Sequence, residues 1–267
     1  MDGKLYLILG RTGDILGALP IVQHEAAVGR KACVMVSREY ADVLDGAGVA
    51  RIVWDGDWRH VRAAYDSVVH DWPRIVVLQQ YSTDGWPVQH VTDSFIKEMY
   101  RVANKLPLFP LPLRFDRRDP QRESALVAAL PEGAPIILVA TRGFSSPFPQ
   151  GHELLALVAD AFPDAVLVTM DAVRAERIYD LLALFERASC LVTVDSALLH
   201  LAQATPSLAV IALVASHPTT WHGSPAYAGQ RLRIRYREFD RNKGRIVEIL
   251  GACLESAPAL GPRRATA

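Results

Sequence analysis

The sequence has little cysteine, no long apolar run and no excess of either charge. Its three cysteines, Cys33, Cys190 and Cys253, lie far apart and have no histidine at metal-ligand spacing, which argues against a disulfide framework or a zinc site. No stretch is long enough to span a membrane, and the apolar run from Leu5 to Leu9 is too short for a signal peptide. We therefore expect a cytoplasmic chain without an integral membrane segment.

The charges balance, with 29 basic and 29 acidic residues in 267. No global field therefore favours nucleic acid or an acidic membrane surface as a partner, and partners must be inferred from local patterns. Half of the residues are apolar, which is enough for one large core or two modest ones.

Apolar runs of strand length alternate with amphipathic helical stretches, and this alternation occurs twice. The first series has expected strands near 4–9, 32–36, 50–54 and 74–79, and helices near 15–28, 38–45, 58–70 and 91–103. The second has expected strands near 135–140, 165–169, 190–194 and 208–213, and helices near 121–130, 151–161, 173–187, 197–204 and 242–255. The pattern predicts an α/β fold of two Rossmann-like, doubly wound domains, with ligands bound in a cleft beyond the carboxyl ends of the strands.

A proline-rich stretch, Leu106 to Leu113, separates the two series. Its three prolines allow neither a helix nor a central strand. We expect an N-terminal domain over residues 1–106, a linker over 107–120, a C-terminal domain over 121–257 and a disordered tail over 258–267.

An abrupt strand-to-helix junction follows the β-branched run Leu191 to Val194. Asp195 and Ser196 are good helix caps, and the amides of residues 196–198 would point with the helix dipole at a ligand beyond the strand. His200 lies one turn further on the same helix face and can add a donor. The junction predicts a phosphate site, and the alternative is an ordinary strand and helix with a capping Asp and a core His.

The loop after the first strand runs from Gly10 to Asp14 and opens a helix. Gly10 and Gly13 permit a tight turn and a close approach of the backbone to a ligand. Asp14 is expected at the helix N-terminus, facing the cleft. Plain helix capping is the alternative role for this residue.

Two segments carry a resemblance to a known family. The segment from Leu7 to Pro20, with its strand, Gly-Asp turn and proline-bearing helix, resembles the opening of the ADP-heptose:lipopolysaccharide heptosyltransferases, glycosyltransferase family 9. The segment from Val192 to Ala202 resembles the same family's Asp-Ser/Thr-Gly-x-x-His-x-Ala block, and an apolar strand, Leu208 to Leu213, follows it as expected. Both blocks lie in the right halves and the right order.

The resemblance implies the GT-B fold and an inverting, metal-independent transfer of a sugar from a nucleotide-diphosphate sugar to a hydroxyl acceptor, with no cofactor. A saccharide such as a lipopolysaccharide core is the first acceptor class. The resemblance also implies that Asp14 is the general base and that the last helix, near 242–255, can pack on the N-terminal domain. The residues implied in donor diphosphate binding are Thr141, Arg142, Asp195, Ser196, Ala197 and His200. Such a reaction needs a base for the acceptor hydroxyl and stabilisation of the charge that develops on the leaving phosphate.

The sequence departs from the family pattern in two places. Ala197 replaces the usual glycine, which crowds the phosphate approach but keeps the backbone amide. The chain is also short between Met170 and Arg187, where contacts to the donor base are expected. The sugar, the nucleotide and the acceptor therefore stay open, and so does the effect of these departures on activity.

Further loops follow strands and supply additional candidates. The stretch after residue 79 lies on the acceptor side and can stack a sugar or base, or is a surface loop; its candidates are Gln80, Trp86 and His90. The loop after 208–213 corresponds to one that lines the family's donor site; its candidates are Thr219, Thr220 and His222. Residues 143–147 could fold over the phosphates as a lid.

An NADP-dependent oxidoreductase is the alternative enzyme. Gly10, Gly13 and Gly17 form a loose dinucleotide fingerprint, and Ser37-Arg38 stands where a 2′-phosphate reader would lie. Against this class, the chain has no Tyr-x-x-x-Lys pair, and Asp14 would repel a bound pyrophosphate. The Asp55-Gly-Asp57 sequence has the form of a metal-binding D-x-D motif, but its position between a strand and a helix favours a surface turn.

A nucleotide- or nucleic-acid-binding protein without catalysis is the third class. Residues 231–237 alternate between arginine and apolar residues, so a strand would place four arginines on one face: Arg231, Arg233, Arg235 and Arg237. These could grip a polyphosphate, and a hydroxylated DNA base would then be a possible acceptor. The alternative is a solvent-exposed edge strand whose charged side chains prevent it from pairing with another chain.

Overall fold

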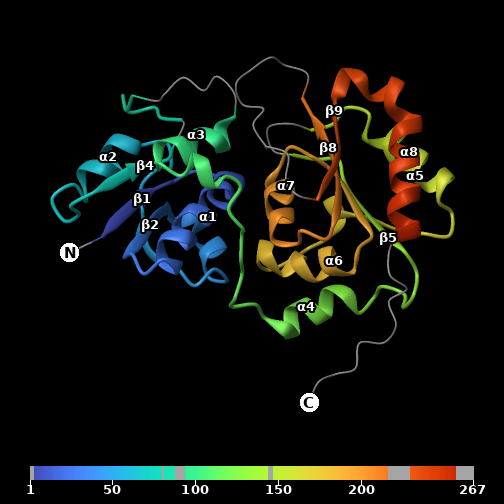
Figure 1. The fold of residues 1–267 in the computed structure, drawn as a ribbon, viewed down its shortest axis with the longest axis horizontal. Helices are drawn as coiled ribbons and strands as arrows, with labels where there is room; N and C mark the ends of the chain where they lie inside the picture. The colour runs from blue at the N-terminus through green and yellow to red at the C-terminus, as the bar shows by residue number, and fades with distance from the viewer. Residues whose placement is uncertain (1–2, 80, 88–93, 144–146, 216–228, 257–267) are drawn as a thin grey trace. The chain divides into compact units, whose positions relative to one another are not determined.

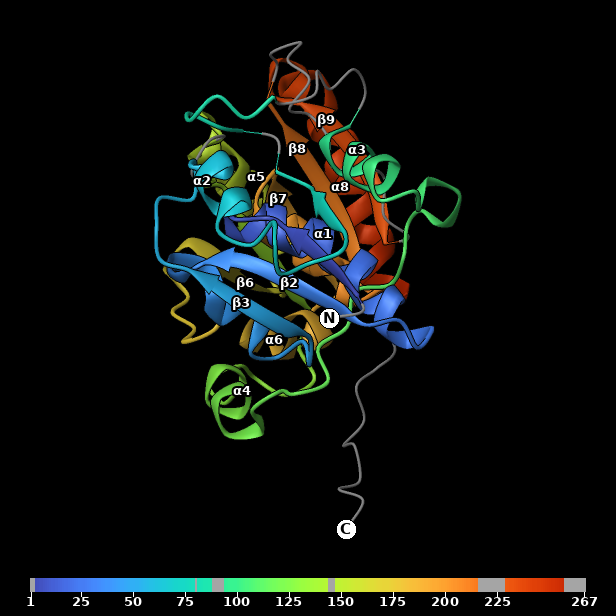
Figure 2. The ribbon, with the colours of Figure 1, turned by 90° about the vertical axis from the view of Figure 1, so that its left-hand side faces the viewer.

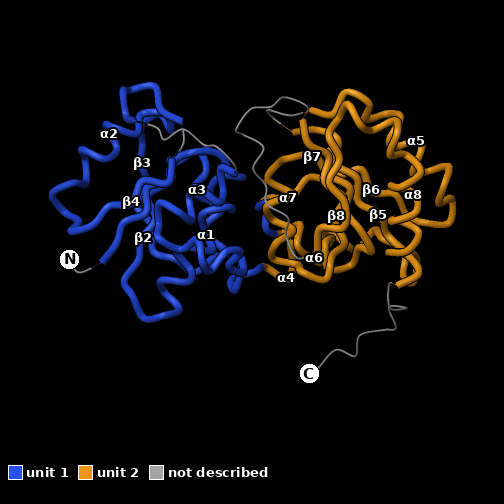
Figure 3. The backbone as a smooth tube through the Cα atoms, turned by 45° about the horizontal axis from the view of Figure 1, so that its top comes forward, with its two compact units in different colours: residues 1–118, 177–179, 218–227 blue, residues 119–176, 180–217, 228–267 orange. Residues whose placement is uncertain are grey.

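The computed structural model describes residues 3–79, 81–87, 94–143, 147–215 and 229–256. It is an α/β protein with two separate parallel sheets (Figure 1). The chain forms two compact units (Figure 3). The first unit contains the described chain up to residue 118 together with residues 177–179, and the second contains the rest of the described chain. Among these described residues, no helix combines the length and apolar character needed to cross a membrane.

The sheet of the first unit has the order β3-β2-β1-β4, with all strands parallel (Figure 2). Its strands are β1 (Lys4–Leu7), β2 (Ala32–Ser37), β3 (Ala50–Trp54) and β4 (Ile75–Val77). Its helices are α1 (Thr12–Ala27), α2 (Val61–Asp66) and α3 (Phe95–Val102), with 3-10 helices η1 (Arg38–Leu44) and η2 (Leu106–Leu108). β1 is buried beyond its first residue because it is a central strand covered on both faces.

Helices cover both faces of this sheet. α2 packs through Val61 and Ala64 against Leu5 and Leu7 of β1. α1 covers the other face with α3 beside it, and Gly17 is the point of closest approach. A Cβ at Gly17 would lie 2.2 Å from Cδ1 of Ile96, so this glycine gives the Ile96 side chain its place between the two helices.

A buried ion network closes the end of α1. The Glu25 carboxylate is fully buried and pairs with Lys4 at 2.9 Å, Arg30 at 3.1 Å and Lys105. Burial alone would raise the pKa of Glu25, but hydrogen bonds from Lys105 and Lys4 outweigh it and lower the pKa to about 2. The network lies where β1 begins, at the opposite end of the sheet from the candidate residues.

The stretch expected as a linker is part of the first unit. Leu113 and Phe115 are buried, Gln23 exchanges hydrogen bonds with the backbone of Arg114, and the amide of Arg117 donates to Gly46 at 3.0 Å. The prolines prevent this segment from forming a central strand or a long helix. Its extended backbone can still bury every second side chain, as it does with Leu113 and Phe115. The boundary between units falls at residues 118 and 119.

The sheet of the second unit has the order β6-β5-β7-β8-β9, also all parallel. Its strands are β5 (Ile136–Ala140), β6 (Val166–Thr169), β7 (Cys190–Val194), β8 (Ala209–Val214) and β9 (Gln230–Arg235). Its α-helices are α4 (Pro120–Val127), α5 (Gly151–Ala161), α6 (Leu182–Arg187), α7 (Ala197–Leu201) and α8 (Phe239–Ser256). Its 3-10 helices are η3 (Met170–Ala172), η5 (Ala202–Ala204) and η6 (Tyr236–Glu238), while η4 (Ile178–Leu181) begins in the first unit.

The last helix, α8, packs on the sheet of its own unit. It lies beside α5, and its residues Phe239, Ile246 and Leu250 are buried in the core formed by β5, β7, β8 and β9 (Figure 1). The family resemblance implied that this helix can pack on the N-terminal domain, whereas the packing contacts described for it lie within the second unit. The reason is local: α8 follows β9 through the short η6, and its apolar stripe completes the face that α5 covers only in part.

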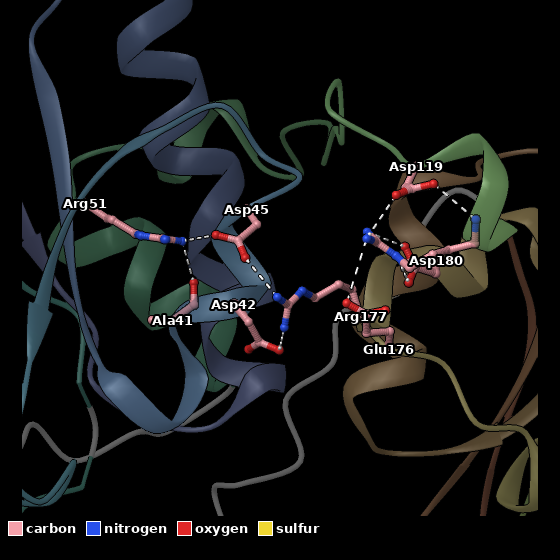
Figure 4. A network of polar contacts seen from close by, with 9 residues as sticks. Ala41, Asp42, Asp45, Arg51, Asp119, Glu176, Arg177 and Asp180 are labelled. Atoms are coloured by element: carbon pink, nitrogen blue, oxygen red, sulfur yellow. Dashed lines mark hydrogen bonds and ion pairs between the residues drawn. The ribbon is translucent and has the colours of Figure 1, made fainter.

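The helix expected over 173–187 is interrupted. Tyr179 is buried in the first unit, where its ring stacks on Phe115 at 5.2 Å between centroids and contacts Gly46. Arg177 pairs there with Asp42 at 3.3 Å and Asp45 at 3.6 Å (Figure 4). These tertiary contacts override helix propensity, so helical backbone resumes only at η4 and α6.

In the second unit, Asp180 directly follows this segment. It is fully buried and accepts two hydrogen bonds from Arg122 of α4, at 2.9 Å and 3.3 Å (Figure 4). Arg122 also pairs with Asp119, the N-cap of α4, and with Glu176 at 3.9 Å. Each end of the segment is therefore held by its own ion pairs.

Candidate functional site

Asp14 lies in the first turn of α1, at the carboxyl edge of the first sheet. The helix begins at Thr12, so Asp14 is the third helical residue, and Arg11 is the N-cap without a side-chain capping bond. The backbone amide of Asp14 donates to Arg11 at 2.9 Å. Asp14 is therefore not the N-cap but an acidic residue of the first turn, where the helix dipole favours its charge. Gly13 precedes it within the same turn.

Gly10 and Gln79 hold the turn that precedes Asp14. The Gly10 amide donates to Oε1 of the buried Gln79 at 3.0 Å. A Cβ at Gly10 would lie 2.9 Å from Nε2 of Gln79 and 3.1 Å from Oδ2 of Asp14, so the absent side chain lets both groups converge on this point. Gln79 was not among the candidates, although its position two residues after β4 could have indicated it.

Tyr40 is a second neighbour of Asp14 that the pattern of motifs did not single out. Burial and a hydrogen bond with Glu39 raise the pKa of Tyr40 to about 12, with a smaller contribution from the charge of Asp14 and an opposing one from Arg11. The phenol is half-buried in η1, directly after β2. It stays protonated at neutral pH, and its hydrogen is used in the bond with Glu39.

The remaining acceptor-side candidates are only partly described. Trp86 packs against Tyr65 of α2, with ring centroids 4.8 Å apart, and the Arg62 guanidinium lies 4.8 Å from its ring centroid. The residues around this ring therefore give it a packing role. Gln80 and His90 lie outside the described residues.

The residues that suggested an NADP site or a D-x-D metal site are bound to other residues of the protein. Ser37 is buried and its hydroxyl donates to the Leu9 carbonyl at 2.8 Å, while Arg38 pairs with Asp55. Asp57 pairs with Arg59 and accepts from its amide at 2.8 Å, as expected of a surface turn. Among the described residues, no group of three or more His, Cys, Asp and Glu side chains could hold a metal ion.

In the second unit, the end of β5 is tied to Asp171 of η3. Its carboxylate accepts from the Thr141 hydroxyl at 2.8 Å, the Thr141 amide at 3.2 Å and the Arg142 amide at 3.3 Å. The Thr141 hydroxyl thus has its hydrogen directed at a carboxylate, which leaves it a positioning role beside any anion. The Arg142 side chain is exposed. Asp171 was not predicted as a site residue. It follows β6, and it reaches the end of β5 only because these two strands are neighbours in the sheet.

Ser196 is the N-cap of α7 and makes no side-chain capping bond. Its Oγ is buried and has no hydrogen-bond partner among the described residues. The amides of Leu199 and His200 donate to the Ser196 carbonyl, so the amides of residues 196–198 precede the first helical bonds. α7 has five residues and η5 continues it, so the expected helix over 197–204 tightens after its first turn. Ala197 keeps its amide in that turn.

His200 is buried one turn into α7. Its Nε2 lies 3.9 Å from Oδ1 of Asp195. Burial lowers the pKa of His200, and the charge of Asp195 opposes that shift in part. Burial, and to a lesser degree Asp195, also raises the pKa of Tyr236, which follows β9 at the same edge and packs on Phe148. A neutral imidazole and a phenol therefore flank Asp195.

The arginine-rich segment forms β9 at the edge of the second sheet. Leu232 and Ile234 are buried, whereas Arg231, Arg233 and Arg235 are exposed. Arg237 lies in η6, so the strand presents three arginines instead of four. The pattern matches a charged edge strand. The lid segment 144–146 and the loop candidates Thr219, Thr220 and His222 lie outside the described residues.

Comparison with known proteins relates the chain to glycosyltransferases by structure. No family model and no curated protein sequence matches it. A glycosyl transferase family 9 protein from Veillonella parvula superposes with a TM-score of 0.65 at 11% identity, over 96% of this chain and 98% of that one. E. coli ADP-heptose LPS heptosyltransferase II gives 0.66 at 15% identity, over 95% and 98%.

E. coli heptosyltransferase WaaC with ADP gives a TM-score of 0.54 at 15% identity, over 94% of this chain and 98% of that one. These likenesses extend over nearly the whole of both chains in every pair. The two parallel sheets and their connections are thus those of the family 9 glycosyltransferases and ADP-heptose heptosyltransferases, and this chain has their fold.

Proposed function

We propose that this protein is a glycosyltransferase that moves a sugar from a nucleotide-diphosphate sugar to a hydroxyl acceptor, with inversion and without a metal. The observation that carries the proposal is the buried hydroxyl of Ser196, which has no partner among the described residues and lies at a strand end of a fold shared with ADP-heptose transferases. A buried polar group without a partner costs free energy, and a bound diphosphate would supply the missing acceptor.

The second unit supplies donors for that diphosphate. The Ser196 hydroxyl, the amides that open α7, the neutral His200 and the exposed Arg142 can each donate to phosphate oxygens. Hydrogen bonds to phosphate strengthen as negative charge develops on the leaving group, which favours the transition state over the bound donor. Thr141 and Asp171 fix the strand end from which Arg142 projects.

The first unit supplies the base. We assign Asp14 to take the proton from the acceptor hydroxyl, since it lies in the first turn of α1, where its carboxylate and Gln79 converge on Gly10. Gln79 positions the turn through Gly10, and the phenol of Tyr40 is held by Glu39. We retain the expectation that the two units are the halves of a GT-B enzyme.

The test is calorimetric titration with ADP, GDP, UDP and NADP, each with and without EDTA. We expect one nucleoside diphosphate to bind with an affinity that EDTA leaves unchanged, and ADP is the first candidate because WaaC is known with ADP. NMR of the transfer product should give an anomeric configuration opposite to that of the donor. Preferential binding of NADP would overturn the proposal in favour of an oxidoreductase.

A matched pair of variants links the binding to Ser196. Ser196→Ala removes the proposed ligand hydroxyl, and Thr205→Val removes the other buried hydroxyl of this unit that lacks a partner among the described residues. Only Ser196→Ala should weaken nucleotide binding. Binding of a nucleoside diphosphate with no turnover on any sugar donor would leave a binding protein as the function.

A further inference from the structure

We infer that the first unit carries a stacking site for a neutral sugar ring of the acceptor, formed by Trp58 and Tyr81 beside Arg11. This inference rests on the proposed glycosyl transfer and names the acceptor class. The three residues follow three different strands, β3, β4 and β1, so the loops at one edge of the sheet bring them together.

The ring contacts define the surface. The Trp58 and Tyr81 rings lie 5.7 Å apart between centroids, tilted by 37°, and the Arg11 guanidinium lies 5.4 Å from the Trp58 ring centroid. Tyr81 is 41% exposed and Trp58 is half-buried, so part of this aromatic surface remains open. Pyranose rings have faces lined with C–H groups, which pack on aromatic faces while their hydroxyls stay at the rim.

The loop that carries Tyr81 is fixed before any ligand binds. The Thr83 amide donates to the Arg59 carbonyl at 3.0 Å, and the Asp84 carboxylate accepts from the Ala63 amide at 3.0 Å and the Ser82 hydroxyl at 2.7 Å. Burial would raise the pKa of Asp84, but these hydrogen bonds lower it to about 2. A preordered loop loses little conformational entropy when a ligand stacks on it.

Two cations of the loops around this surface are paired. Arg38 pairs with Asp55 and Arg59 pairs with Asp57. A nucleic-acid backbone needs an excess of Lys and Arg along its path, and these pairs do not provide one. The paired loops therefore fit a saccharide better than a DNA backbone.

The surface also lies close to the proposed base. Asp14 follows Arg11 by three residues within the first turn of α1, and both charges act on Tyr40. A ring held on Trp58 and Tyr81 would thus present its rim hydroxyls toward the end of α1 that carries Asp14. Stacking would orient the acceptor, and Asp14 would act on one hydroxyl.

The experiment measures binding of the methyl pyranosides of glucose, galactose and mannose to the full chain by saturation-transfer NMR. We expect at least one to bind through its ring C–H protons, and Tyr81→Ala to weaken it about three- to tenfold, the scale of one aromatic contact. Tyr81→Phe should retain the affinity. Trp86→Leu is the matched control, because the ring that packs on it, Tyr65, is half-buried, whereas Tyr81 is exposed.

The outcomes separate this inference from the proposed function. Binding of none of the three pyranosides, or equal affinity in Tyr81→Ala, overturns the stacking site even if ADP binds. Tighter binding of a single-stranded oligonucleotide that depends on Tyr81 also overturns it, in favour of a base-stacking surface. Pyranoside binding that depends on Tyr81 without any nucleotide binding would uphold the site and reject glycosyl transfer.

Discussion

The carboxyl edges of the two sheets hold their polar groups in different ways. In the first unit, Gly10 is bound to Gln79 and Tyr40 to Glu39, so the groups around Asp14 are fixed by protein contacts. In the second, the Ser196 hydroxyl is buried without a partner among the described residues, and the Arg142 side chain is exposed. The first edge therefore presents the carboxylate of Asp14 in a fixed position, and the second presents hydrogen-bond donors that can bind an anion.

The two edges have similar strand ends, but they are proposed to do different chemistry: one holds a general base and the other binds a phosphate. A general base must be held in place before the acceptor arrives, and that requires partners. A phosphate site needs donors whose hydrogens are not already used, and that leaves them unsatisfied without ligand. Variants at the two edges should therefore fail in different measurements.

The largest effect is expected for Asp14→Asn. Loss of the base should lower turnover by about two to four orders of magnitude, while nucleotide affinity and melting temperature hold. Asp55→Asn, another carboxylate after a strand of the same sheet, is the control and should keep full turnover. Initial-rate kinetics measure both, and normal turnover in Asp14→Asn would reduce Asp14 to a structural residue.

The stability of the first unit should depend on Glu25. Glu25→Gln leaves Lys4 and Lys105 without their buried partner and should cost about 3–5 kcal/mol in the free energy of unfolding. Glu153→Gln breaks an exposed pair with Lys243 in the second unit and should cost about 1 kcal/mol or less. Denaturant unfolding of the two variants gives the comparison, and equal losses would contradict it.

Acid should act through the same carboxylate. The pKa of folded Glu25 is about 2, below its ordinary value of 4.5, so the unfolded chain takes up the proton at higher pH. The contribution of Glu25 to stability is therefore complete above pH 4.5 and is lost as pH falls towards 2. Unfolding curves across this range should be steeper in pH for the parent chain than for Glu25→Gln.

Smaller effects are expected at the donor side. Arg142→Ala and His200→Gln should each weaken nucleoside diphosphate binding by about 1.5–3 kcal/mol, the range for hydrogen bonds to charged groups. Glutamine is used at position 200 because the structure buries this side chain and alanine would leave a cavity. Unchanged affinity with a lowered melting temperature in His200→Gln would identify a core histidine.

The smallest effect is expected for Ser196→Ala. Binding should weaken by about 0.5–1.5 kcal/mol, because the backbone amides remain. Stability should stay the same or rise, since the variant removes a buried hydroxyl that has no partner among the described residues. Calorimetry and thermal melting of the same samples check both, and a large loss of stability would contradict the assignment.

The sequence predicted the bounds of the strands better than it predicted which side chains lie around the candidate site. The expected strands at 50–54 and 190–194 coincide with β3 and β7, because β-branched apolar runs end sharply at turn residues. Ser196 was a candidate because it follows a strand end, and Asp14 because the turn that opens α1 resembles a family motif. Asp171 and Tyr81 were not, because their roles depend on pairing between loops that only the sheet order brings together.

The errors in helices have a similar origin. Local periodicity favoured one helix over 173–187, and the burial of Tyr179 against Phe115 overrode it. The position of α8 was taken from the family resemblance, whereas its own apolar stripe fits the sheet that precedes it. Propensity is a weak guide wherever a few tertiary contacts outweigh it.

Residues 177–179 also govern how the chain can be assembled or divided. The first unit is incomplete until these residues emerge during synthesis, because Phe115 and Gly46 lack their aromatic partner until then. A fragment ending at residue 118 would expose that apolar contact and lose the cation that bridges Asp42 and Asp45. The halves are therefore not independent modules that can be exchanged at the boundary, and a chimera must carry residues 177–179 from the same parent as its first unit.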